Sequence, residues 1–143
     1  MKLLIANANT TEAITALCAG AARAAASPGT EIVAATPRFG PAVISSRLEN
    51  AVAAHGILDL LAGHAGRVDA VVLAVSLDTA LLAARQMMPC PVIGMTEAAC
   101  VAACLLGGRF GLVTFGTPGQ YRDLVVERGY ERRLAGIRVI EAE

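Results

Sequence analysis

The chain alternates between short apolar runs and longer stretches in which apolar residues recur at helical spacing. The run "KLLIANA" at residues 2–8 predicts a strand, and "TTEAITALCAGAARAAA" at residues 10–26 predicts a helix after it. Thr10 or Thr11 is expected to cap this helix, and "SPG" at residues 27–29 ends it. The side chains expected to face the core are Ile14, Leu17, Cys18, Ala21 and Ala25.

Strand-like and helix-like segments continue to alternate along the rest of the chain. Further strands are predicted at residues 30–36, 68–75, 91–95, 109–115 and 137–143, with helices at 47–63, after Ser76, at 96–106 and at 118–129. The residues expected to face inward from the helix at 47–63 are Leu48, Val52, Leu58 and Leu61. This alternation predicts an α/β fold with a doubly wound, mostly parallel sheet, in a single lobe that spans residues 1–143.

Composition narrows the class of partner. The 143 residues are 55% hydrophobic and 3% aromatic, with no tryptophan, so the core must be aliphatic. Twelve basic residues balance twelve acidic ones, and aromatic platforms for nucleic-acid bases are scarce. No apolar run approaches the ~20 residues of a membrane span. We therefore expect neither a nucleic acid nor a membrane as partner.

The lysine and cysteine content limits the kinds of catalysis and metal binding that can be expected. The chain has one lysine, Lys2, so catalysis through a Schiff base is disfavoured. The four cysteines (Cys18, Cys90, Cys100 and Cys104) lack the spacing of a secreted disulfide framework, which favours the reducing cytoplasm. Cys100 and Cys104 share a helix face but lack further ligands, so they are interpreted as core residues and no metal site is expected.

Small polar residues cluster where the predicted strands end and helices begin. These residues are Asn7, Asn9, Thr10, Ser76, Asp78, Thr79, Thr96, Glu97, Thr114, Gly116 and Thr117. Each alone is more simply a helix cap, but the carboxyl ends of parallel strands share one edge of a sheet, where ligands bind. Free N–H groups at helix N-termini favour anions. The pattern predicts a site for a small carboxylate or imide, and no Gly-rich nucleotide fingerprint occurs.

The ordered set of motifs resembles a known family. "NANTT", "SPGTEI", "LDTALLAAR", "PVIGMTEAA" and "GGRFGLVT" occur in the order seen in the hydantoin racemase branch of the aspartate/glutamate racemase superfamily. The resemblance implies two α/β lobes that face each other across a cleft. It also implies that one cysteine from each lobe transfers the α-proton of a hydantoin or amino acid, without a cofactor. Helix N-termini would lower the thiol pKa and stabilise the enolate-like charge.

Two features depart from that family pattern. The resemblance places Ser76 where the family has its first cysteine. A thiol has a pKa of ~8.5, whereas the pKa of an alcohol is far higher, so serine does not readily lose its proton to act as a base. The surrounding "AVSLD" lacks the G-x-S-x-G elbow, so Ser76 is interpreted as a ligand-binding hydroxyl or cap and as a poor unassisted base. The chain also stops where the resemblance predicts the second lobe. We expect either a piece of a longer protein or a half-length protein that forms a homo-oligomer.

Other charged and ionisable residues are given structural interpretations. Asp78 is expected in the first turn of the short helix after Ser76, beside the site. His55 and His64 are expected at the opposite edge of the sheet, too far to activate Ser76. The arginines at 128, 132 and 133 are expected on a solvated helix face.

Three functional hypotheses follow. The first is a cofactor-independent hydantoin or amino-acid racemase, inactive as this half-length chain, in which Asn7, Asn9, Thr10, Asp78, Thr79 and Thr114 bind substrate around Ser76. The second is a one-thiol decarboxylase or isomerase of small diacids. The third is a non-catalytic module for small-molecule binding or assembly.

Overall fold

The strands form two separate parallel sheets. The computed structural model describes residues 1–115 and 118–140. The first sheet has the order β2-β1-β3-β4, and its strands are β1 (Lys2–Ala6), β2 (Glu31–Ala35), β3 (Ala70–Leu73) and β4 (Val92–Gly94). The second sheet pairs β5 (Phe110–Thr114) with β6 (Leu134–Val139). The α/β character and the parallel pairing predicted from the alternation are confirmed.

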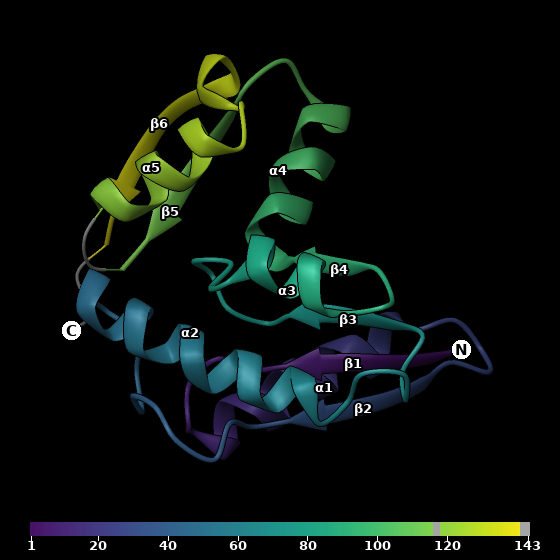
Figure 1. Cartoon of the computed structure of the whole chain (residues 1–143). Coiled ribbons are helices and arrows are strands. Elements are labelled where there is room, and N and C mark those ends of the chain that lie inside the picture. The colour runs from purple at the N-terminus through teal and green to yellow at the C-terminus, as the bar shows by residue number, and fades with distance from the viewer. Residues whose placement is uncertain (116–117, 141–143) are drawn as a thin grey trace.

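Helices cover both faces of the first sheet. The first two connections cross the sheet in opposite directions, through α1 (Glu12–Ala25) and then α2 (Arg47–Ala62). Because parallel crossovers are right-handed, the two helices lie on opposite faces. The short α3 (Leu81–Met87) packs beside α2, as Figure 1 shows. No helix in the described ranges is long and apolar enough to cross a membrane.

An aliphatic core lies between the first sheet and α2. Leu4, Leu73, Ile57 and Leu61 are fully shielded from solvent, and Leu81 of α3 closes the same cluster. Burying such side chains contributes about 1.5–3 kcal/mol each, before the cost of ordering the chain. This core holds the loop after β3 against the sheet.

The second sheet is a distinct unit at the far end of α4. The helix α4 (Met95–Leu106) leaves the edge of the first sheet at β4 and carries the chain away from it, as Figure 1 shows. β5, α5 (Pro118–Glu127), a 3₁₀ turn (Glu131–Arg133) and β6 then pack around Cys100 and Val125. The expectation of one continuous sheet is therefore wrong, because β5 pairs with β6 and not with β4.

The inward faces predicted for two helices also need correction. In α1, Leu17 is 70% exposed and Ile14 is 39% exposed, while Thr15 and Ala19 are buried. In α2, the exposed side chains include Leu48 and Val52, whereas Leu61 is buried as predicted. Both helices are rich in alanine, so several faces are apolar enough to pack. In α1 the buried face carries small side chains, whereas in α2 it carries Ile57, Leu60 and Leu61.

Candidate functional site

A cavity of about 460 Å³ lies between the two sheets, and we call it the inter-sheet cavity. Its polar lining residues come from both sides of the gap: Ser45, Ser76, Thr96, Thr114, Gln120 and Tyr121. Its apolar lining residues are Val43, Ile44, Leu77, Leu112, Val113 and Phe115. None of these twelve side chains is charged. The cavity is therefore suited to a small, largely neutral molecule.

Ser76 enters the cavity from the loop between β3 and α3. This loop has two non-glycine residues with left-handed backbone, Asp78 at φ 48° and Ala80 at φ 59°. Such conformations cost free energy and persist only where surrounding contacts hold them. Asp78 is therefore not in the first turn of α3, as the sequence predicted, because that helix begins only at Leu81.

Two hydrogen bonds hold the Ser76 segment. The Oγ of Ser76 lies 2.8 Å from the phenol oxygen of Tyr121 in α5. The hydroxyl of Thr96 donates to the main-chain carbonyl of Ser76 at 2.6 Å. Ser76 is half-buried and thus remains accessible from the cavity. The main chain of Ser76 is therefore held from α4, and its hydroxyl from α5.

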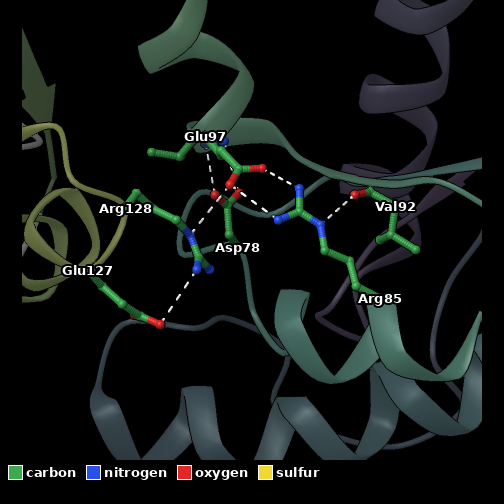
Figure 2. A network of polar contacts seen from close by, with 7 residues as sticks. Asp78, Arg85, Val92, Glu97, Glu127 and Arg128 are labelled. Carbon is green, nitrogen blue, oxygen red and sulfur yellow. Dashed lines mark hydrogen bonds and ion pairs between the residues drawn. The ribbon is translucent and has the colours of Figure 1, made fainter.

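Asp78 caps the N-terminus of α4. Its carboxylate accepts from the main-chain N–H of Thr96 at 2.9 Å and of Glu97 at 2.8 Å, and the residue is only 3% exposed. Burial raises the pKa of Asp78, while the two N–H donors oppose that rise. The N–H groups that were expected to attract a ligand carboxylate at this helix are thus occupied by Asp78 (Figure 2).

A network of charged side chains continues from Asp78. Glu97 pairs with Arg85, whose Nε also donates to the carbonyl of Val92 at 3.0 Å. From the turn after α5, Arg128 places its Nε 3.8 Å from Glu97 and its Nη1 3.5 Å from Glu127, as Figure 2 shows. The Arg128 side chain is 11% exposed. Its predicted place on a solvated face is therefore wrong, and it joins the two units of the fold.

Four of the predicted substrate-binding residues have other partners. Asn7 is fully buried, and its amide donates to Thr15 at 3.0 Å and to the Oδ1 of Asn9 at 3.0 Å. Asn9 in turn accepts from the N–H of Thr11, which is the N-cap residue of α1, so Asn9 stabilises the turn that leads into this helix. The structure does not bring these asparagines into the lining of the inter-sheet cavity.

Thr10 and Thr79 are also outside that lining. The N–H of Thr10 donates to the carbonyl of Pro41. The hydroxyl of Thr79 donates to the side chain of Asn50 at 2.6 Å, and Thr79 is buried. Thr114, by contrast, lines the cavity as the end of β5. The predictions at Gly116 and Thr117 lie outside the described residues. The structure thus brings together three strand ends, at Ser76, Thr96 and Thr114.

Sequence reasoning missed Tyr121, Gln120 and Ser45 as lining residues. The signal for Tyr121 was available but weak: it is one of two tyrosines in a chain with few aromatics, and it stands in the first turns of the helix after β5. Helices that follow strand ends point their first turns at the same edge where ligands bind. Its hydrogen bond with Ser76, 45 positions away, could not be predicted from the local sequence.

The cysteines and histidines lie away from the cavity. None of the four cysteines is among its lining residues, and Cys100 of α4 is buried against the second unit, where burial raises the pKa of its thiol. His55 packs edge-on against Phe39, and the Nδ1 of His64 lies 2.9 Å from the carbonyl of Leu60. No group of three potential metal ligands occurs within residues 1–115 and 118–140.

Comparisons with known proteins agree on one family. The family model described as Asp/Glu/Hydantoin racemase matches residues 3–142. A hydantoin racemase from Pseudomonas sp. (strain NS671) is 36% identical over 141 residues, a match that covers 96% of this chain and 57% of that protein.

Solved structures give the same result. An allantoin racemase from Klebsiella pneumoniae superposes with a TM-score of 0.96 at 37% identity, over 99% of this chain and 59% of that one. An allantoin racemase from Pseudomonas fluorescens superposes with a TM-score of 0.90 at 34% identity, over 97% and 60%. The chain thus spans a little over half the length of these similar proteins.

Proposed function

Because this chain belongs to the Asp/Glu/hydantoin racemase family, we propose that it forms the first lobe and part of the substrate site of a cofactor-independent racemase. In this proposal the inter-sheet cavity holds a hydantoin-like ring with its α-carbon near Ser76. The activity is the removal and return of the α-proton. Ser76 and Thr114 contact the substrate, together with Tyr121, which was not predicted.

The uncharged lining of the cavity is the observation that carries this proposal. A buried carboxylate without a cationic partner is costly, whereas an imide ring needs only hydrogen bonds. The described lining offers hydroxyls and one side-chain amide. This supports a neutral ring over the small diacids of the decarboxylase hypothesis.

The proton-transfer step itself needs a stronger base than the cavity lining contains. An alcohol such as Ser76 is protonated at all ordinary pH values, and the described lining includes no thiol. We therefore expect this chain alone to bind the ring without racemising it. The same observation favours the alternative hypothesis of a non-catalytic binding module, which needs no base.

Proton exchange in heavy water tests the proposal. We expect the chain to bind 5-methylhydantoin or allantoin in calorimetric titration, with little exchange of the α-proton. Ser76→Cys, produced with whatever coding sequence follows Glu143 in the gene, should increase that exchange measured by NMR. Val75→Cys is the matched control, because Val75 is the preceding residue but is only 8% exposed.

Each outcome separates the hypotheses. Exchange gained with Ser76→Cys alone supports the racemase proposal and the position of Ser76. Exchange gained only with Val75→Cys contradicts the placement of Ser76 at the thiol position. Ring binding with no exchange in either variant supports the binding module. Consumption of a malonate-type acid, followed as released CO₂, would favour the decarboxylase.

We also propose that the protein is cytoplasmic and self-associates. All four cysteines are free thiols, which agrees with a reducing compartment. Several large apolar side chains are exposed, including Leu105 at 83% and Leu106 at 91%. Such surfaces are commonly covered by another protein surface.

A further inference from the structure

Tyr121 and Ser76 form a pair of hydroxyls that joins the two units across the inter-sheet cavity. The phenol comes from α5 in the second unit, and the serine follows β3 in the first. Their oxygens are 2.8 Å apart, and both residues are half-buried among the lining residues. A ligand that reaches this pair therefore meets both units at once.

The face of α5 that carries Tyr121 is anchored along its length. Leu124 lies three residues further on and is 7% exposed, and Arg128 lies four residues beyond that and pairs with Glu97. Residues at these spacings share one helix face. The N–H of Arg128 still donates to the carbonyl of Leu124, so the helical geometry persists to this point. The position of the phenol is therefore set by contacts outside the cavity.

The hydroxyl pair has a defined hydrogen-bonding capacity. Two hydroxyls carry two protons, and one of these is used in the bond between them. The pair can thus donate one hydrogen bond and accept others from the remaining lone pairs. Adjacent donor and acceptor groups on a ligand, such as the N–H and C=O of a ring amide, match this arrangement. A carboxylate only accepts, so it leaves acceptors facing acceptors.

We propose that Tyr121 is a specificity-determining residue that, with Ser76, selects the N–H/C=O edge of a neutral cyclic amide over a carboxylate. This inference rests on the proposed function, since it assumes that the inter-sheet cavity is the substrate site. The lining supports this inference, because none of the twelve described lining residues is a cation that could pair with a carboxylate. Tyr121 acts by binding and orientation and takes no proton from carbon.

The contact itself is tested without a ligand. The chain contains two tyrosines and no tryptophan, so Tyr130→Phe leaves Tyr121 as its single tyrosine fluorophore. Adding Ser76→Ala to this variant should change the tyrosine emission and near-ultraviolet absorption, because the phenol loses its partner. In Tyr121→Phe, where Tyr130 is the reporter, Ser76→Ala should leave the spectrum unchanged. Equal spectra in the first comparison contradict the hydroxyl pair.

Recognition is tested with two probes, 5-methylhydantoin and 2-methylpropanoate, a small carboxylate that carries no N–H group. Tyr121→Phe keeps the aromatic ring and should weaken binding of the hydantoin about two- to tenfold, the range for one lost hydrogen bond. Binding of the acid should not weaken. Tyr130→Phe is the control, because Tyr130 packs in the second unit and should leave both affinities unchanged. Ser76→Ala combined with Tyr121→Phe should cost less than the sum of the two single changes.

The outcomes distinguish this inference from the proposed function. If the hydantoin binds but Tyr121→Phe and Tyr130→Phe behave alike, the inference fails and the proposed site stands. If Tyr121→Phe weakens both probes equally, Tyr121 stabilises the cavity but does not discriminate between ligands, and the inference again fails. If the unaltered chain binds neither probe, both the proposed function and the inference are contradicted.

Discussion

At the scale of the residue, Asp78 was predicted to contact a ligand, and in the structure its carboxylate binds the main chain instead. Its position after a buried strand suggested a ligand contact. In the structure the same carboxylate binds two main-chain N–H groups at the start of α4, eighteen or more residues away. Charge-assisted bonds of this kind are stronger than bonds between neutral groups. Asp78 therefore organises the cavity wall by fixing α4 next to Ser76.

The carboxylate of Asp78 explains why position 94 is a glycine. A Cβ placed on Gly94 would lie 2.5 Å from the Cγ of Asp78, and that carboxylate is too firmly bound to move away cheaply. Gly94→Ala should lower the free energy of unfolding by about 1–3 kcal/mol, as overpacking does. Urea unfolding measures this change. Gly108→Ala is the control, because nothing lies within 4 Å of its added Cβ. Equal effects of the two substitutions would contradict this explanation.

Residue roles could be predicted only where the cause is local. The apolar-to-polar changes at the strand ends correctly indicated that Ser76 and Thr114 lie close together, but they meet across a cavity between two sheets and not at one edge of a single sheet. Arg128 was assigned to solvent because its neighbours along the chain are charged. Its burial depends on Glu97, thirty-one positions away, and no spacing rule reports such a contact. Substrate contacts at the other predicted positions remain predictions.

At the scale of the element, the start of α2 is the part of the fold most directly specified by local sequence. Ser46 caps the helix, and its Oγ accepts from the N–H of Glu49 at 3.1 Å. The Glu49 carboxylate reaches back to the N–H groups of Ser45 and Ser46, each at 2.8 Å. This capping box needs only residues three apart. The predicted start at Arg47 is accordingly confirmed, whereas the buried face of α1 depended on the sheet and was missed.

The capping box makes the free energy of unfolding depend on pH in the acidic range. Hydrogen bonds from Ser45 and Ser46 lower the pKa of Glu49 from 4.5 to about 2. The folded state therefore binds the proton more weakly than the unfolded state. The contribution of Glu49 is fully present above pH 4.5 and is lost as the pH falls toward about 2.

Removing the carboxylate should remove this dependence. In Glu49→Gln the chain should be less stable at neutral pH, and its unfolding free energy should decline less than that of the unaltered chain on acidification. Chemical unfolding at about pH 6 and about pH 3 measures the difference. Glu12→Gln removes an exposed carboxylate from the first turn of α1 and serves as the control. Parallel declines in Glu49→Gln and the unaltered chain would contradict the role of Glu49.

At the scale of the whole molecule, the division into two sheets was beyond the reach of the sequence pattern. Alternation along the chain orders the strands but does not say which strands pair. The decisive step is the path of α4, which leaves the first sheet and lets β5 pair with β6. The two units then meet through Tyr121 of α5, at the cavity, and through Arg128 in the turn after α5, at the charged network.

The Arg128 contact should therefore control how firmly the second unit is held. Arg128→Met keeps much of the side-chain volume but leaves Glu97 with one fewer cationic partner. We expect a loss of up to about 1 kcal/mol, the usual range for an ion pair, because the Nε of Arg128 lies 3.8 Å from Glu97 and has no hydrogen-bond partner among the described residues. Hydrogen exchange should rise most in α5 and β6. Arg122→Met, which replaces an exposed arginine of α5, should leave exchange unchanged. A uniform rise over both sheets would show that Arg128 acts on the whole fold instead.

The exposed apolar side chains give the last prediction, which concerns assembly. Val101 and Leu105 are four residues apart on α4 and are 42% and 83% exposed, and Leu106 beside them is 91% exposed. Together they form an apolar face on the helix that links the two units. Water contact with this face is unfavourable, and a second copy of the chain is the partner always present at equal concentration.

The chain should sediment as an oligomer at micromolar concentration, and Leu105→Gln with Leu106→Gln should shift it toward monomer. Leu17→Gln, on the opposite face of the first sheet from α2, tests whether any exposed leucine has the same effect. A stable monomer of the unaltered chain would contradict the proposed self-association.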